Sequence, residues 1–270
     1  MKGCKYFKYT SAVKGRVAAR LITISKSTNL VVAYCATKAL QASENLSIRQ
    51  NGLIRFLKRD DVSDLMVNDL LHYFHRDNVA YYDEIGKSLK NICYDESITA
   101  EKKKVITLYM ADHNFFSQAD FLLNSLEKRE YNRANAPVIT GLIEALGRLH
   151  VKEAAPLIKE YLNTAETSLQ ITCVRALGRL GGEENLLFLL NSILRFDFTV
   201  RKEIIKVLVN NSEAGIPLLL QFLDVNQKFV SYSRDQSELT IEMEELIRKI
   251  RSTARGIRIL LPAKVVNSHG

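Results

Sequence analysis

The chain has 270 residues and a mass of 30.7 kDa, with 47% hydrophobic residues, 25% charged residues and a net charge of +8. This balance is typical of a globular protein, and 12 glycines with 4 prolines are too few for a turn-rich β-sandwich or barrel. No apolar run approaches the roughly 20 residues of a membrane-spanning helix, which excludes a transmembrane segment. The four cysteines form no Cys-x-x-Cys pair, so we expect no disulfide framework and a cytoplasmic location.

The first segment, residues 1–43, is strongly basic and contains neither Asp nor Glu. Helices are predicted over 14–24 and 29–42, and Tyr and Phe alternate with lysines at the start of the segment. Such a segment is most simply a solvated helix pair whose lysines keep this end of the protein soluble. Contact with nucleic acid or with an anionic membrane surface is the first alternative, and an organelle-targeting peptide is the second. The candidates for contact with a polyanion are Lys2, Lys5, Lys8, Lys14, Arg16, Arg20 and Lys26.

Residues 44–134 follow as degenerate helical repeats. Ser47-Ile48-Arg49 leads into an apolar helix, and the periodicity of apolar residues predicts four more helices. These predicted helices cover residues 62–76, 79–93, 101–111 and 116–128.

Residues 135–224 contain an internal repeat with a period of about 31 residues. Ala-Leu-Gly-Arg-Leu occurs at 145–149 and again at 176–180, so Gly147 and Gly178 occupy equivalent places. The surrounding apolar residues recur at offsets of 4, 4 and 3, which form one stripe of a helix. The three stripes are Val138, Leu142, Leu146 and Leu149, then Leu169, Cys173, Leu177 and Leu180, then Val200, Ile204 and Leu208. A second helix follows each stripe, so we predict three helical hairpins.

The predicted ends of these helices contain residues that favour helix termini. Gly181-Gly182 is expected to end a helix in the left-handed conformation, and Pro156 and Pro217 to occupy first turns. Thr167 with Gln170 has the spacing of a capping box, and Asp197 is placed to cap the helix starting near Thr199. Residues 225–270 are expected to form a capping helix from Ser237 to about Thr253 and a tail.

One hairpin cannot bury its own apolar face, so neighbouring hairpins must stack. The predicted fold is therefore all-α, a right-handed α-solenoid (an α-α superhelix) of stacked antiparallel helical hairpins.

The repeat resembles two known patterns. The stretch from Asp197 to Arg201, followed by Ile204 and Val207-Leu208, resembles the D-x-x-V-R-x-x-A-x-x-A-L core of HEAT repeats. The Ala-Leu-Gly-Arg-Leu stretches resemble the ending of the short HEAT-like repeats of phycobilisome lyase subunits. The resemblance implies a HEAT/armadillo-like scaffold in which Asp197 and Arg201 belong to an Asp–Arg ladder. The equivalent places in the other two repeats hold Glu166 with Gln170 and Asn135 with Ile139, so this ladder is incomplete.

Motifs that would indicate metal binding, nucleotide binding or catalysis are weak in this sequence. His72 and His75 have a spacing that can hold a metal, but no further His or Cys is near them in sequence. Gly86-Lys87-Ser88 resembles the end of a phosphate-binding loop, but Tyr81 stands where that loop requires glycine. We therefore expect no catalytic residue, no metal site and no cofactor.

The leading functional hypothesis is a non-catalytic scaffold that binds another protein along one face of the solenoid. One alternative is a nucleic-acid-binding protein similar to HEAT-like DNA glycosylases, although the chain has no Trp and its positive charge is concentrated at one end. A second alternative is a subunit associated with a lyase. A third is a membrane-peripheral adaptor that uses the basic segment.

Overall fold

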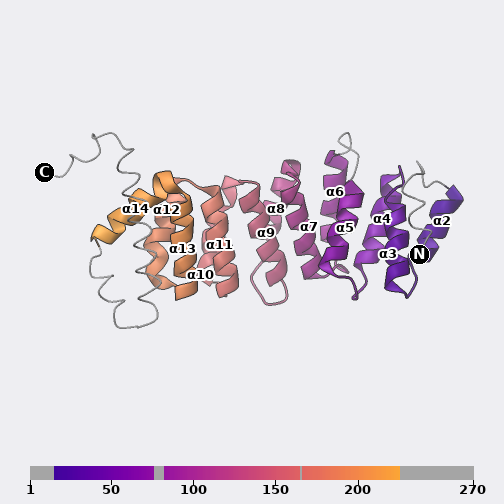
Figure 1. The fold of residues 1–270 in the computed structure, drawn as a ribbon, viewed down its shortest axis with the longest axis horizontal. Helices are drawn as coiled ribbons and strands as arrows, with labels where there is room; N and C mark the ends of the chain where they lie inside the picture. The colour runs from indigo at the N-terminus through magenta and orange to yellow at the C-terminus, as the bar shows by residue number, and fades with distance from the viewer. Residues whose placement is uncertain (1–14, 76–81, 165, 226–270) are drawn as a thin grey trace. The chain divides into compact units, whose positions relative to one another are not determined.

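The structure is a computed structural model that describes residues 15–75, 82–164 and 166–225. All regular secondary structure in these residues is helical (Figure 1). The all-α class is therefore confirmed. The chain divides into two compact units, Met1–Tyr161 and Leu162–Gly270, which are described separately below.

The first unit contains eight α-helices within its described residues, and a ninth begins in it. They are α2 (Gly15–Ile24), α3 (Leu30–Leu40), α4 (Leu46–Leu57), α5 (Asp64–His75), α6 (Tyr82–Tyr94), α7 (Ala100–Asp112), α8 (Ala119–Glu127), α9 (Ala136–Arg148) and the start of α10 (Ala155–Thr164). The helices predicted between residues 14 and 128 are confirmed where the structure describes them, with bounds that differ by at most three residues. Residues 14, 76 and 79–81 of these predictions lie outside the described residues. Gly86 lies inside α6, as expected, and not at a strand-to-helix turn.

Packing in the first unit joins helices that are two apart in the chain. Helix α3 packs on α5, α5 packs on α7, and α7 packs on α9, while α4 contacts α6. Leu40, Phe56, Phe74, Ile106 and Phe115 are among the side chains that are completely buried between these helices. Each of these helices thus buries apolar side chains against the helix two places further along the chain.

The second unit shows the same order of contacts in fewer residues. It contains α11 (Thr167–Leu180), α12 (Glu183–Ser192), α13 (Phe198–Asn210) and α14 (Ser212–Val225). Helix α11 packs on α13, and α12 packs on α14. The predicted stripes on α9, α11 and α13 are buried. These three helices begin at residues 136, 167 and 198, which confirms the period of 31 residues.

The seam between α11 and α13 depends on Gly178. A Cβ atom at this position would meet the side chain of Val207 well inside van der Waals contact. Gly147, the equivalent residue of α9, is also buried. In the first unit another glycine of α9 has this role, because a Cβ atom at Gly141 would lie 2.9 Å from the Cα of Lys104 on α7.

Asp197 links successive helices of the second unit. Its carboxylate caps α13 by accepting a hydrogen bond from the Val200 amide at 3.0 Å. It also accepts a hydrogen bond of 2.9 Å from the Thr167 hydroxyl at the start of α11. These bonds, and above all the bond from the Val200 amide, lower the pKa of Asp197. The Arg201 guanidinium donates to the carbonyl oxygen of Phe196 at 2.6 Å.

Two predictions about helix ends are wrong. Glu166 and not Thr167 is the N-cap of α11, and the Thr167 hydroxyl donates to Asp197 instead. Pro217 is the sixth residue of α14, which begins at Ser212, and so lies beyond the first turn. Gly181 ends α11 as expected, with a positive φ of +65°.

Candidate interaction surface

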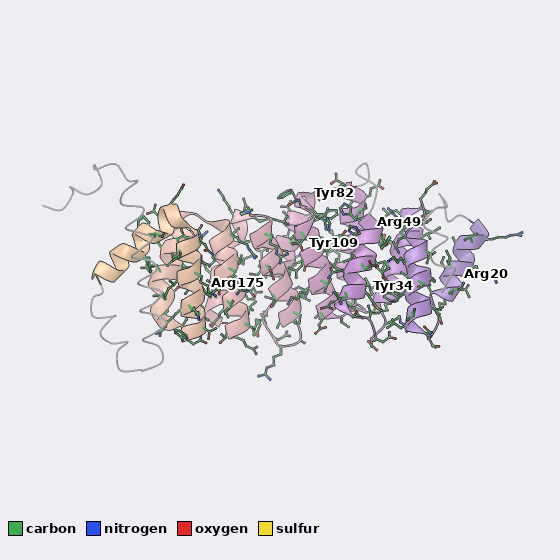
Figure 2. The ribbon with its side chains drawn as sticks, in the orientation of Figure 1. Arg20, Tyr34, Arg49, Tyr82, Tyr109 and Arg175 are labelled. Atoms are coloured by element: carbon green, nitrogen blue, oxygen red, sulfur yellow. The ribbon has the colours of Figure 1, made fainter. Side chains whose placement is uncertain are left out.

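Three of the seven predicted polyanion contacts fall on described residues. Lys2, Lys5, Lys8 and Lys14 lie outside them. Arg16 and Arg20 are exposed on α2, and Lys26 is exposed in the connection that follows (Figure 2). Within the described part of the chain, none of these three cations has an ion-pair partner. Their positive charges therefore face solvent without local compensation.

The same helix carries exposed apolar side chains. Val17 is 45% exposed and Ile24 is 39% exposed, while Ala18 and Leu21 are buried against α3. Val17, Arg20 and Ile24 are spaced by three and four residues, so they follow one another along α2. At the start of α3, Val31 and Val32 are 49% and 43% exposed.

The connection between α2 and α3 is five residues long, so Ile24 at the end of α2 and Val31 in the first turn of α3 are close in the chain. We define the N-terminal face as Arg16, Val17, Arg20, Ile24, Lys26, Val31 and Val32. It combines three uncompensated cations with four exposed aliphatic side chains. Contiguous exposed apolar surface bordered by polar groups is typical of an interaction site.

The apolar surface continues toward α5. The Arg59 guanidinium donates to the carbonyl oxygens of Ser27 at 2.7 Å and Thr28 at 3.1 Å, so the connection before α5 lies against the connection before α3. Leu65, in the first turn of α5, is 81% exposed. The starts of α3 and α5 thus present Val31, Val32 and Leu65 at the same edge of the first unit.

Exposed apolar residues are unevenly distributed. All seven large apolar side chains that are well exposed among the described residues lie between Val17 and Phe116. The sequence predicts a protein partner along one face of the solenoid without indicating these exposed apolar residues. The signal that sequence reasoning missed is the width of the apolar arc on α2, where Val17, Leu21, Ile22 and Ile24 span more of the helix than α3 covers.

Lys38, the remaining cation of the basic segment, is used inside the first unit. Its ammonium group lies 2.9 Å from the Asp69 carboxylate and 4.0 Å from the centre of the Tyr73 ring. The Tyr34 hydroxyl donates to the same carboxylate. Burial, with the hydrogen bond to Asp69, raises the pKa of Tyr34 to about 12. This network joins α3 to α5 and leaves Lys38 unsuited to bind a polyanion.

The two histidines of the predicted pair have different surroundings. His72 is exposed, whereas His75 is half-buried in an aromatic cluster with Tyr82, Tyr109, His113 and Phe115. The ring centres of His75 and His113 are 5.0 Å apart, and Tyr82 stacks on Phe115 at 4.2 Å. Figure 2 labels Tyr82 and Tyr109 of this cluster.

Hydrogen bonds within the aromatic cluster connect the helices that contribute to it. The Tyr109 hydroxyl lies 3.2 Å from Nδ1 of His75, and the Tyr82 hydroxyl donates to the carbonyl oxygen of His113. Burial lowers the pKa of both His75 and His113, so both imidazoles favour the neutral form. Across the described residues, no three His, Cys, Asp or Glu side chains are grouped as a metal site.

Comparison of the chain with protein-family models, curated proteins and solved structures finds no match. Among the residues that the structure describes, no helix is both long and apolar enough to cross a bilayer. The proposals that follow rest on the residues and contacts given above.

Proposed function

We propose that this protein is a non-catalytic helical-repeat scaffold that binds another protein through the N-terminal face. The observation that supports this proposal is that exposed cations and exposed aliphatic side chains lie on adjoining elements. The cations are Arg16, Arg20 and Lys26, and the aliphatic residues are Val17, Ile24, Val31 and Val32. An occupant of this face should offer carboxylates for the cations and aliphatic side chains for the valines. An acidic amphipathic helix of a partner protein has this chemistry.

The scaffold is proposed to be a right-handed α-solenoid of HEAT-like repeats. Contacts between helices two apart in each unit support this arrangement. Side-chain hydrogen bonds support it further, because several join residues about one repeat apart. Examples are Lys38 with Asp69, Tyr82 with His113, and Thr167 with Asp197, which are separated by 31, 31 and 30 residues.

A cytoplasmic location is part of this proposal. Cys35, Cys93 and Cys173 are free thiols in the described residues. Free thiols persist where the compartment is reducing.

The N-terminal face can be tested with a site-specific photo-crosslinker. The crosslinking amino acid would replace Val31 in the full chain expressed in its own host, with nuclease added to the lysate. A matched position is Lys87, which is exposed on α6 outside the face. We expect one protein partner to be crosslinked from position 31 and not from position 87.

Charge reversal then distinguishes the nature of the partner. Arg16→Glu with Arg20→Glu should reduce crosslinking at position 31 at least tenfold, whereas Lys87→Glu should leave it unchanged. Loss of the crosslinked species on nuclease treatment would instead favour nucleic acid. Flotation of the purified chain with phosphatidylserine vesicles, abolished by the double reversal, would favour the membrane-peripheral alternative. Either result would overturn the protein partner.

A further inference from the structure

A second surface of the first unit forms a hollow that the N-terminal face does not include. It has a volume of about 280 Å³ and is lined by Tyr94, Asn124, Ser125, Lys128 and Arg129. A smaller cavity of about 20 Å³ shares Tyr94, Ser125 and Arg129 with it and reaches down to Lys103 and Cys93. Both spaces lie between the ends of α6 and α8 and the adjoining side of α7, and we refer to them together as the pocket.

The pocket is cationic. Lys103, Lys128 and Arg129 line it, and no Asp or Glu lines either space. Within the described residues these three side chains have no ion-pair partner. Their charges therefore add, and the lack of a carboxylate leaves the pocket ready for an external anion.

Arg129 is the cation that lines both spaces. Its Nε atom is buried and has no hydrogen-bond partner, so the guanidinium is not fully paired within the described residues. Because Nε has no accessible surface, an anion in the pocket would be bound by the other nitrogens of the guanidinium. Guanidinium groups match the geometry of phosphate and carboxylate oxygens.

Cys93 shows that these cations act at the base of the pocket. Burial raises the pKa of its thiol to about 12, while the charges of Lys103 and Arg129 oppose that rise. The thiol therefore stays protonated and is not a nucleophile at neutral pH. The pocket is suited to binding and not to covalent catalysis by this cysteine.

An aromatic wall stands beside the cations. The Tyr94 ring is 60% exposed and packs edge-to-face on Phe121, with ring centres 5.2 Å apart. The Lys90 ammonium lies 5.6 Å from the centre of the Phe121 ring and adds positive charge on the far side of this ring pair. A ligand ring can stack on the exposed face of Tyr94 while its anionic group meets Arg129.

We propose that this pocket binds a small aromatic phosphate monoester. The phosphate would contact Lys103, Lys128 and Arg129 and accept from the Ser125 hydroxyl and the Asn124 amide, and the ring would stack on Tyr94. A doubly charged phosphate fits three uncompensated cations better than a single carboxylate does. The volume is near the lower end of the roughly 300 to 1,000 Å³ of small-molecule sites, which favours a ligand with one ring.

Calorimetric titration of the full chain with phenyl phosphate tests the site. We expect saturable binding at one site, and at least tenfold weaker binding of phenyl phosphate by Arg129→Gln. Lys87→Gln removes an exposed charge outside the pocket and should leave the affinity unchanged. Lys128→Gln is the second pocket variant, needed if circular dichroism shows that Arg129→Gln does not fold.

Two further titrations separate the parts of the proposal. Tyr94→Ala should reduce the affinity for phenyl phosphate to that for inorganic phosphate, and benzoate should bind at least tenfold more weakly than phenyl phosphate. Equal affinity of the wild type and both pocket variants would overturn the site. Absence of phenyl phosphate binding to the wild type would do the same, without bearing on the N-terminal face.

Discussion

The two units stack helices in the same order but connect them differently. In the first unit, α3, α5, α7 and α9 begin at residues 30, 64, 100 and 136, so successive starts are 34 to 36 residues apart. In the second unit, α11 and α13 begin 31 residues apart. Their helices have similar lengths. The difference lies in the connections, which take up five to eight residues in the described part of the first unit and as few as one or two in the second.

Side-chain donors pair with carbonyl oxygens near the ends of helices in the first unit. In the first unit, Lys102 is buried and donates from its ammonium group to the carbonyl oxygens of Leu57, at 2.7 Å, and Arg59. The Tyr161 hydroxyl donates to the carbonyl oxygens of Leu126, at 3.2 Å, and Arg129. Such donors satisfy carbonyl groups that a helix leaves unpaired at its C-terminus. The comparison indicates that a repeat can have longer connections where side-chain donors pair with the carbonyl oxygens that a tight turn would otherwise pair.

The largest predicted effect concerns the glycine at each seam. Gly141→Ala and Gly178→Ala should each lower the free energy of unfolding by about 3 kcal/mol, because the added methyl group overpacks a close helix contact. Urea denaturation followed by circular dichroism measures both.

A second substitution should restore stability at the seam in the second unit and not at the seam in the first. Val207→Ala should restore most of the stability lost in Gly178→Ala, because the obstructing atoms belong to that side chain. Thr107→Ala should not restore the stability lost in Gly141→Ala, because the Cα of Lys104 still lies 2.9 Å from the added Cβ atom. Equal rescue in both units would show that the seams do not differ.

The second prediction concerns these side-chain donors. Lys102→Met keeps the bulk of the side chain but leaves the Leu57 and Arg59 carbonyl oxygens without this donor, and we expect a loss of about 2 kcal/mol in the free energy of unfolding. Gln170→Leu in the second unit removes a longer bond, 3.4 Å to the Leu162 carbonyl oxygen, and should cost about 0.5 kcal/mol. Similar losses by urea denaturation would contradict the importance of these donors in the first unit.

The third prediction uses pH. Burial lowers the pKa of His75 and His113, so the unfolded chain binds protons at these residues before the folded chain does. Their contribution to stability is complete above about pH 6.5 and is lost as the pH falls through the lowered pKa values. Thermal unfolding between pH 7.5 and 5 should show this loss. The described residues of the second unit contain no histidine.

A double variant provides the control for the pH effect. His75→Phe with His113→Phe should flatten the dependence of the melting temperature on pH, whatever its absolute stability. His72→Phe removes an exposed ring whose charge contributes to the lowered pKa values of His75 and His113, so it should weaken the pH dependence less than the double variant does. An unchanged slope in the double variant would assign the pH effect to other groups.

The smallest predicted effects concern ion pairs. Asp69→Asn removes the partner of both Lys38 and Tyr34 and should cost about 1 kcal/mol. Glu203→Gln breaks the 2.8 Å contact with Arg175, whose side chain is 54% exposed, and should cost only about 0.3 kcal/mol. In 0.5 M NaCl the second cost should disappear in urea denaturation while the first persists. A Glu203 effect as large as that of Asp69 would contradict this ranking.

Local residue patterns determined the positions of the helices and their buried stripes. Apolar spacing alone predicts the first stretch from Val138 to Leu149 and its equivalents, and Asp197 is a cap because a short acidic side chain reaches the free amides of the next turn. The 31-residue period is detectable because helices and connections together take up the same length from α9 to α11 and from α11 to α13. In the first unit the period varies, so no fixed offset aligns the residues.

Tertiary structure decided which of these residues face solvent and which meet. Val17 and Leu21 look alike in sequence, but only Leu21 is covered by α3. Tyr94, Lys103 and Arg129 come from different elements, and only packing brings them to one pocket. The physical reason is that helix periodicity is a local property, whereas burial and charge compensation depend on neighbours that lie about one repeat away in the chain.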